Sequence, residues 1–421
     1  SGLWTFSTLG WPNKTDDLKM YHPTSALETG YDILFFWVAR MILMSTYLLG
    51  EIPFKTVYLH GLVRDEQGRK MSKSLGNIID PLDVSEKYGT DAVRLSLLLG
   101  SAPGNDTRLS DEKIAGYRNF TNKLWNIARF IVLQMSDEQL TMNNHKPKGK
   151  TLADRWVISR LDEVVSLVTK DIEEYGFSAA GELLRDFTWN ELADWYLEIA
   201  KIEKGKDDIL NYILNAVLKL WHPYMPFVTE AIWQEVYGKE RMLMIERWPI
   251  VIAKSRRSLG TLGTGSAIHD FDHIKNIITN IRSIRADYNI EPSKKLSVSV
   301  KTKKYQSLMN DNKAVIVALA RLESVSVASV VERTKSMVTF VVGKIEVNVD
   351  LVGAINLEKE KARLEKEINH VAPFVQSLKK KLANKEFLKN APKEVVEGER
   401  KKLDEAKEKL EKLEGQLKQF G

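Results

Sequence analysis

Residues 68–77 read Gly-Arg-Lys-Met-Ser-Lys-Ser-Leu-Gly-Asn, which places two lysines three positions apart between two glycines. Glycine reaches backbone angles that other residues avoid, so the stretch predicts a loop. Lysine ammonium groups, serine hydroxyls and backbone amides are groups that hold phosphate in proteins. The stretch therefore indicates an anion-binding loop, although a lone pair of lysines at this spacing is more often a solvated turn.

The sequence before this loop predicts a parallel α/β unit. Tyr21–Glu28 is predicted to be a short strand with Pro23 at its edge, and Thr56–Val63 is a β-branched, apolar segment typical of a second strand. Ile33–Leu49 between them is an apolar helix pattern. Arg40 interrupts that pattern, so we expect a buried helix rather than a membrane span. A strand that runs directly into a ligand loop is how open α/β sheets bind nucleotides. A further helix is expected over Asp83–Leu99.

The pentapeptide Lys70-Met71-Ser72-Lys73-Ser74 resembles the signature loop of class I aminoacyl-tRNA synthetases. Its flanks, residues 60–65 and 77–81, resemble the valyl-tRNA synthetase form of that loop, and the resemblance covers all 421 residues. It implies that valine is activated with ATP, as its Mg²⁺ complex, to valyl-adenylate and is then transferred to tRNA(Val). It also implies a cytoplasmic monomer.

The resemblance assigns roles to individual residues. Lys73, with Lys70, would neutralise the charge that grows on the leaving pyrophosphate. Ile33 and Trp37, about one helical turn apart, would form walls of the amino-acid pocket. The implied contacts to ATP and the adenylate are Glu28, Gly30, Asp32, His60, Gly61, Met71, Ser72 and Ser74. From spacing alone, Asp32 is equally well read as a plain cap of the helix that follows it.

We expect four parts, residues 1–108, 109–252, 253–353 and 354–421. The first is the second half of a Rossmann-type catalytic domain. Long amphipathic patterns predict a helical bundle for the second, which the family uses to bind the anticodon. Within it, helices are expected over Trp156–Tyr175, Phe177–Lys201 and Asp208–Val236, beside one that starts near Ser110. Arg129 and Phe130 are candidates for contact with RNA bases.

The third part is predicted to be a small α+β module that follows a linker over Arg256–Ser266. Its helix, Ile268–Tyr288, places Arg282 and Arg285 on one side, which makes both candidates for tRNA contact. Alternating patterns predict strands at residues 296–300, 325–330, 337–342 and 345–349.

The last part carries apolar residues in steps of four and three, first from Leu364 to Leu382 and again from Val396 to Phe420. This pattern predicts an antiparallel coiled-coil hairpin, with a kink at Pro373. The family ends in such a tRNA-binding arm, and a dimerisation arm is the alternative.

Charge and composition agree with a protein that binds RNA in its C-terminal third. Residues 253–304 carry 11 Lys and Arg against 4 Asp and Glu, whereas net charge over the whole chain is only +6. Excess positive charge in one region suggests a polyanionic partner, although lysine-rich faces also simply aid solubility. The sequence contains no cysteine, so no cysteine-ligated zinc is expected, and we predict no metal site and no membrane partner.

Two features of the family are missing from these 421 residues. The chain has no His-x-Gly-His motif for the other side of the ATP site and no room for an inserted editing domain. We therefore expect it to bind tRNA without charging it. An isoleucyl-type synthetase is the nearest alternative, but that family usually has Asp-Gln-x-Arg-Gly-Trp where residues 32–37 read Asp-Ile-Leu-Phe-Phe-Trp. A non-catalytic tRNA-binding fragment is the alternative from another class.

Overall fold

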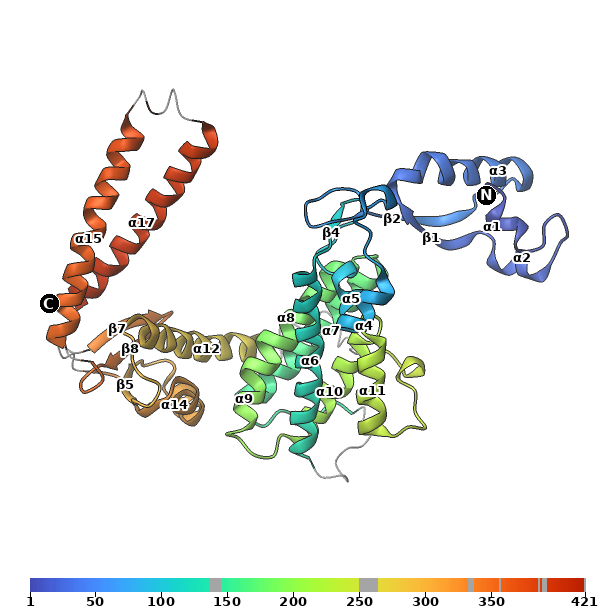
Figure 1. The fold of residues 1–421 in the computed structure, drawn as a ribbon. Helices are drawn as coiled ribbons and strands as arrows, with labels where there is room; N and C mark the ends of the chain where they lie inside the picture. The colour runs from blue at the N-terminus through green and yellow to red at the C-terminus, as the bar shows by residue number, and fades with distance from the viewer. Residues whose placement is uncertain are drawn as a thin grey trace. The chain divides into compact units, whose positions relative to one another are not determined.

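The computed structural model describes residues 1–135, 145–249, 264–331, 337–355, 357–384, 387 and 392–419. The chain forms two compact units, Ser1–Leu262 and Gly263–Gly421, and each is described by itself (Figure 1).

The first unit contains the predicted strand-helix-strand motif near its N-terminal end. Strand β1 (Thr24–Gly30) pairs in parallel with β2 (Phe54–His60), in a register that runs from Thr24 opposite Phe54 to Gly30 opposite His60. The connection consists of a 3-10 turn η1 (Tyr31–Ile33), a π-helical stretch η2 (Leu34–Val38) and α3 (Ala39–Leu49). Two short helices, α1 (Trp4–Ser7) and α2 (Asp16–Tyr21), precede β1.

The helical connection packs on only one side, so the expectation of a buried helix is wrong. Val38 and Met41 pack against Leu27 and Phe54 of the sheet. The opposite side is apolar and exposed, including Phe35, Phe36, Leu43 and Tyr47. Tyr31–Leu49 is also long and apolar enough, by length and composition alone, to cross a membrane. Parallel sheets normally bury both faces under helices, and this two-stranded sheet offers the helix only one surface.

Beyond β2 the chain makes a second small pairing and two helices. Strand β3 (Val63–Arg64) pairs in parallel with β4 (Thr107–Arg108), and the signature loop lies between them in sequence. The single helix expected over Asp83–Leu99 is instead two, α4 (Pro81–Tyr88) and α5 (Thr90–Leu98). Gly89 separates them with φ +91°, a left-handed angle that a helix cannot contain.

The predicted helical bundle follows. Its helices are α6 (Asp111–Leu133), α7 (Leu152–Glu173), the continuous run of α8 (Phe177–Asp186), η5 (Phe187–Tyr196) and α9 (Leu197–Ala200), α10 (Asp207–Trp221) and α11 (Pro226–Tyr237), followed by the 3-10 turn η6 (Leu243–Ile245). The one helix expected over Asp208–Val236 is divided at Pro226, because proline starts helices but cannot continue them. Trp156, Trp221 and Trp233 lie fully inside the bundle.

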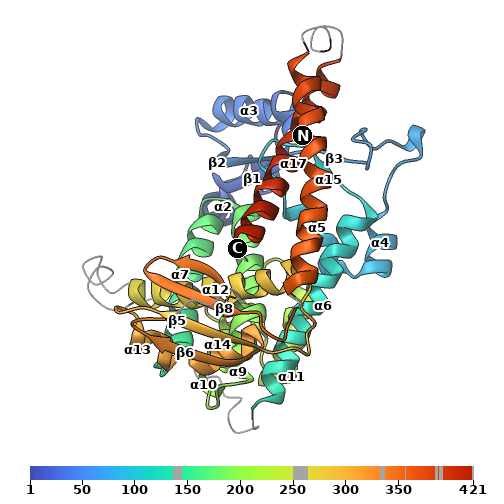
Figure 2. The ribbon, with the colours of Figure 1, turned by 90° about the vertical axis from the view of Figure 1, so that its left-hand side faces the viewer.

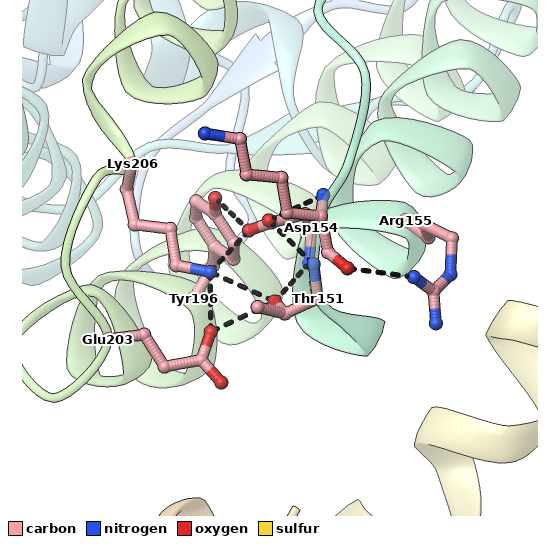
Figure 3. Close-up of polar contacts among 7 residues, drawn as sticks. Thr151, Asp154, Arg155, Tyr196, Glu203 and Lys206 are labelled. Carbon is pink, nitrogen blue, oxygen red and sulfur yellow. Dashed lines mark hydrogen bonds and ion pairs between the residues drawn. The ribbon is translucent and has the colours of Figure 1, made fainter. Parts of the chain in front are cut away.

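A buried polar network connects the start of α7 with the start of α10 (Figure 3). The Lys206 ammonium, only 3% exposed, donates to Asp154 at 2.6 Å and to Thr151 at 2.9 Å, and it also pairs with Glu203. Tyr196 donates to the same Asp154 oxygen at 2.9 Å. Thr151 caps α7, so the network fixes the start of α7 against the start of α10.

The second unit contains a four-stranded sheet in the order β6 (Leu322–Ala328), β5 (Leu296–Lys301), β8 (Ile345–Asp350), β7 (Met337–Val342). Strands β5 and β6 are parallel and the other neighbours are antiparallel. The predicted strands are all present, although β6 starts three residues earlier than expected. The helices of this part are α12 (Thr264–Asp287), α13 (Gln306–Asp311) and α14 (Lys313–Ala320), of which the last two were not predicted. Most of the expected linker lies outside the described residues.

The C-terminal hairpin is formed by α15 (Leu357–Ala383) and α17 (Lys393–Gln419), which run side by side in opposite directions (Figures 1 and 2). Helix α15 continues through Pro373. The buried residues between the two helices follow the predicted apolar pattern: Leu364, Val371, Val375, Leu378, Leu403, Ala406 and Leu413.

Candidate functional site

The carboxyl ends of β1 and β2 meet at one point, where Gly30 lies opposite His60. The Glu28 carboxylate is 3.3 Å from the His60 Nε2 atom beside it. Gly61 cannot be replaced by a residue with a side chain, because a Cβ at this position would lie 1.7 Å from the Asn105 carbonyl oxygen. This part of the site therefore depends on close backbone packing as well as on polar groups.

The signature loop approaches this point. Lys70 Nζ lies 4.0 Å from Asp32 Oδ2, so the loop faces the carboxyl end of β1. Asp32 lies inside the 3-10 turn that follows Gly30, and no side chain caps that turn. The capping interpretation of Asp32 is therefore wrong, and its carboxylate is directed toward the loop instead.

The loop itself is exposed and contains a short turn. Ser72 caps the 3-10 turn η3 (Lys73–Leu75), with its Oγ accepting from the Leu75 amide at 3.3 Å. The Ser72 and Ser74 hydroxyls are 3.1 Å apart. Lys70 is 67% exposed at its side chain, so the loop offers cationic and hydroxyl groups to a solvent-borne anion.

Two polar residues beside the loop were not assigned roles from the sequence. Asp65 is 6% exposed and accepts hydrogen bonds from Arg69 and from the Asn77 amide. The bond from Asn77 is the largest cause that lowers the pKa of Asp65 to about 2, and the bonds from Arg69 add to it. Both residues stand in the flanks of the signature, but nothing in a single sequence indicates that they contact each other.

The predicted amino-acid pocket lies next to a hollow. Trp37 is half-buried, packs on the Leu27 cluster and lies 6.2 Å from Trp4 between ring centroids. A hollow of about 770 Å³ is lined by Trp37, Glu28 and residues of α1 and α2. Ile33 is 37% exposed. Trp37 and Glu28 thus share one concave surface.

The four residues predicted to contact RNA differ in their exposure to solvent. Arg129 is exposed, and Phe130 is half-buried with the Lys201 ammonium 5.5 Å from its ring centroid. Arg282 is exposed, although its Nε donates to the Leu319 carbonyl at 3.0 Å.

Arg285 is unsuitable as an RNA contact, and this prediction is wrong. The residue is 8% exposed, and its guanidinium donates to the carbonyls of Glu291 and Lys294 at 2.9 and 2.8 Å. Burial lowers the pKa of this group from its ordinary value. Those backbone bonds hold the segment between α12 and β5.

Among the residues that the structure describes, no cluster of three or more His, Asp or Glu is arranged to hold a metal ion.

Two family models match the N-terminal and middle parts of the chain, and both describe tRNA synthetases. The family model for class I tRNA synthetases of the I, L, M and V group matches residues 1–110, and the model for the anticodon-binding domain of tRNA ligases matches 154–300. Among solved structures, the chain resembles the LeuRS of Agrobacterium radiobacter K84 in its ternary complex with tRNA and LeuAMS. That likeness has a TM-score of 0.50 and 22% identity over 59% of this chain and 32% of that one, and it supports the fold.

Relatives with higher sequence identity are valine–tRNA ligases. The chain is 43% identical to the valine–tRNA ligase of Syntrophotalea carbinolica over 100% of its own length and 47% of that protein. It is 41% identical to the valine–tRNA ligase of Enterococcus faecalis over 100% of itself and 48% of that protein. The model for the valyl-tRNA synthetase tRNA-binding arm matches residues 356–421. The chain is similar over its whole length to valine–tRNA ligases, and it spans about half the length of the curated relatives it matches.

Proposed function

We propose that this chain supplies the phosphate-binding loop and the tRNA-binding parts of a valine–tRNA ligase. The observation that carries the proposal is the approach of Lys70 to within 4.0 Å of Asp32, at the carboxyl end of a parallel strand pair. A cationic loop that faces this edge of an α/β sheet is suited to binding the phosphates of a nucleoside triphosphate.

The reaction has two steps. A valine carboxylate oxygen attacks the α-phosphorus of ATP, the bond to the bridging oxygen breaks, and pyrophosphate leaves with its Mg²⁺. A terminal ribose hydroxyl of tRNA(Val) then attacks the valyl carbonyl and AMP leaves. Lys73 and Lys70 stabilise charge on the leaving pyrophosphate, and the Ser72 and Ser74 hydroxyls add donors.

Binding groups surround this centre. Glu28, Gly30, Asp32, His60 and Gly61 lie near the ribose and adenylate, and Met71 belongs to the same loop. Ile33 and Trp37 bound the valine side chain. The hollow lined by Glu28 and Trp37 supports the roles proposed for these two residues.

The site requires a second covering segment. One face of η2 and α3 is apolar and open, with Phe35 77% and Tyr47 86% exposed. Because the relatives are about twice as long, we propose that the part of a ligase not spanned by this chain covers that face. The chain alone then binds tRNA without charging it. It is expected to be cytoplasmic and monomeric.

RNA binding rests on the helical bundle, on α12 and on the C-terminal hairpin. The bundle holds the anticodon with Arg129 and Phe130, and Arg282 and the lysine-rich hairpin bind the tRNA backbone. The hairpin, as an antiparallel coiled coil, recognises RNA shape rather than base sequence.

Fluorescence anisotropy on this chain tests the RNA-binding half of the proposal. We expect labelled tRNA(Val) to bind more tightly than a tRNA with a different anticodon, and affinity to fall steeply with salt. Equal affinity for both tRNAs would exclude anticodon recognition by this chain.

A further inference from the structure

We propose that Asp65 and Asn77 act as a clip that fixes the pose of the signature loop, and that both are positioning residues for pyrophosphate release. The inference rests on the function proposed above, because it assigns a role beside the same site. Neither residue touches the reacting atoms, and their action is exerted through Lys70 and Lys73.

One half of the clip is a buried carboxylate at the start of the loop. Asp65 Oδ1 accepts from the Arg69 amide at 2.7 Å, and Oδ2 accepts from Arg69 Nε at 2.8 Å. The backbone adds bonds from the Asp65 amide to the Arg69 carbonyl and from the Gly68 amide to the Asp65 carbonyl. These bonds close a tight turn, with Gly68 at φ +79°.

The other half is the amide side chain at the end of the loop. Asn77 Nδ2 donates to Asp65 Oδ2 at 2.9 Å and to the Lys70 carbonyl at 3.3 Å, and Oδ1 accepts from the Ser72 amide at 2.9 Å. One side chain therefore connects the buried Asp65 to the backbone on both sides of Met71. The amide group donates to a carboxylate and also accepts from a backbone N–H, whereas an ionised aspartate at this position would lose the donor.

The clip controls what the exposed part of the loop can do. The Lys70 side chain is 67% exposed and Leu75 is 59% exposed, so packing contributes little to holding this segment. Polar bonds to a buried, ionised partner are stronger than ordinary ones. Loss of the clip should therefore let Lys70 move away from Asp32, and a displacement of about 1 Å can cost about 10²-fold in rate.

The clip is tested on this chain by hydrogen exchange of the loop peptide, followed by mass spectrometry. Asn77→Asp places a carboxylate against Asp65, so we expect the amides of residues 70–76 to exchange about tenfold faster. The double variant Asp65→Asn with Asn77→Asp restores one carboxylate–amide pair and should recover much of that loss. Asn280→Ala is the matched control, since it removes an amide–carbonyl bond of 2.8 Å at an exposed position of α12, far along the chain. Unchanged loop exchange in Asn77→Asp would overturn the clip.

The catalytic consequence is measured by valine-dependent ATP–pyrophosphate exchange. This assay uses the complemented protein, meaning this chain joined to the part of the Syntrophotalea carbinolica ligase that it does not match. We expect Asn77→Asp to lower kcat about 10- to 100-fold with the KM for valine changed less than about threefold, and the double variant to recover at least part of kcat. A merely structural defect would lower both variants equally. A complemented wild-type protein without exchange activity would count against the proposed function, whereas the clip is still decided by hydrogen exchange.

Discussion

Two apolar helices of the first unit have opposite surroundings. Helix α10 is surrounded by its own bundle, and Leu214, Val217 and Trp221 are at most 1% exposed. The stretch from η2 through α3 is similarly apolar, yet Phe35 and Tyr47 project into solvent. The difference shows that the bundle completes its own core, while the strand-helix-strand part presents a face suited to a further layer.

The polar interior makes the same distinction. In the bundle, Lys206 and Asp154 satisfy each other in full burial. Beside the loop, the charged groups are well exposed. Lys70 Nζ lies 4.0 Å from the Asp32 carboxylate, and the Glu28 carboxylate lies 3.3 Å from His60 Nε2. Buried pairs contribute to a fixed structure, whereas exposed charges around a hollow remain available to a ligand.

The largest expected effect concerns the stability of the bundle. Lys206→Ala leaves the buried Asp154 carboxylate without its cation and should lower the free energy of unfolding by about 3–5 kcal/mol. Guanidinium unfolding measures it, with Lys170→Ala as control, because Lys170 pairs with Glu174 at the exposed surface at 4.0 Å. A loss below about 1 kcal/mol for Lys206→Ala would show that the bundle does not depend on this network.

The same network gives a pH dependence. Burial by itself raises the pKa of Asp154, but the bonds from Lys206, Thr151 and Tyr196 outweigh it and hold that pKa below its ordinary value. A carboxyl group with a lowered folded-state pKa stabilises the fold above its unfolded pKa of about 3.9 and loses that contribution as pH falls further. The stability gap between wild type and Asp154→Asn should therefore be constant from pH 5 to 8 and narrow below about pH 4.

The next effect concerns the loop. Lys73→Ala in the complemented protein should slow ATP–pyrophosphate exchange by about 10²–10³-fold, the scale of losing one preorganised charge contact. Affinity for tRNA should be nearly unchanged. Lys55→Ala, on an exposed position of β2, serves as the control. A loss smaller than threefold would remove Lys73 from the mechanism.

A smaller effect is expected from the hairpin. Deletion of residues 355–421 should leave a folded protein but weaken tRNA(Val) binding by about 2 kcal/mol or more, because several phosphate contacts are lost. The slope of affinity against salt concentration should flatten as well. Equal affinity and equal slope would assign the hairpin another task, and a change from dimer to monomer on deletion would favour a dimerisation arm.

The smallest effect tests the open face directly. Phe35→Ser with Tyr47→Ser should change the free energy of unfolding of this chain by less than about 0.5 kcal/mol, because surface positions contribute little. The same pair should impair exchange in the complemented protein, where we propose that the face is covered. A large loss of stability in the chain alone would mean that these rings are already buried.

Local patterns predicted much of this fold, and long-range contacts account for most of the errors. The bundle and the hairpin follow from periodicity over ten or more residues, and the parallel strand pair follows from two short segments on either side of an apolar helix pattern. Gly89 and Pro226 interrupt two segments that the apolar pattern predicts as single helices. Arg285 was misassigned because helix spacing shows which side a residue occupies, not that backbone carbonyls from residues 291 and 294 meet it there.

The candidate site shows the same division. The lysines and serines of the loop are recognisable from their order alone. The contact between Asp65 and Asn77 spans twelve positions and depends on how the loop closes, which no local rule predicts. The exposure of α3 depends on what covers it, so the 17-residue apolar pattern could not distinguish a complete layer from an open one.

The most direct test compares this chain, alone and complemented, in valine-dependent ATP–pyrophosphate exchange. We predict exchange above background only for the complemented protein, with valine preferred over larger amino acids, because the proposed function assigns this chain one side of the ATP site. Equal exchange by the chain alone would contradict the proposal that it acts together with a further part of a ligase. Absence of valine-dependent exchange in a folded complemented protein would contradict its assignment as part of a valine–tRNA ligase.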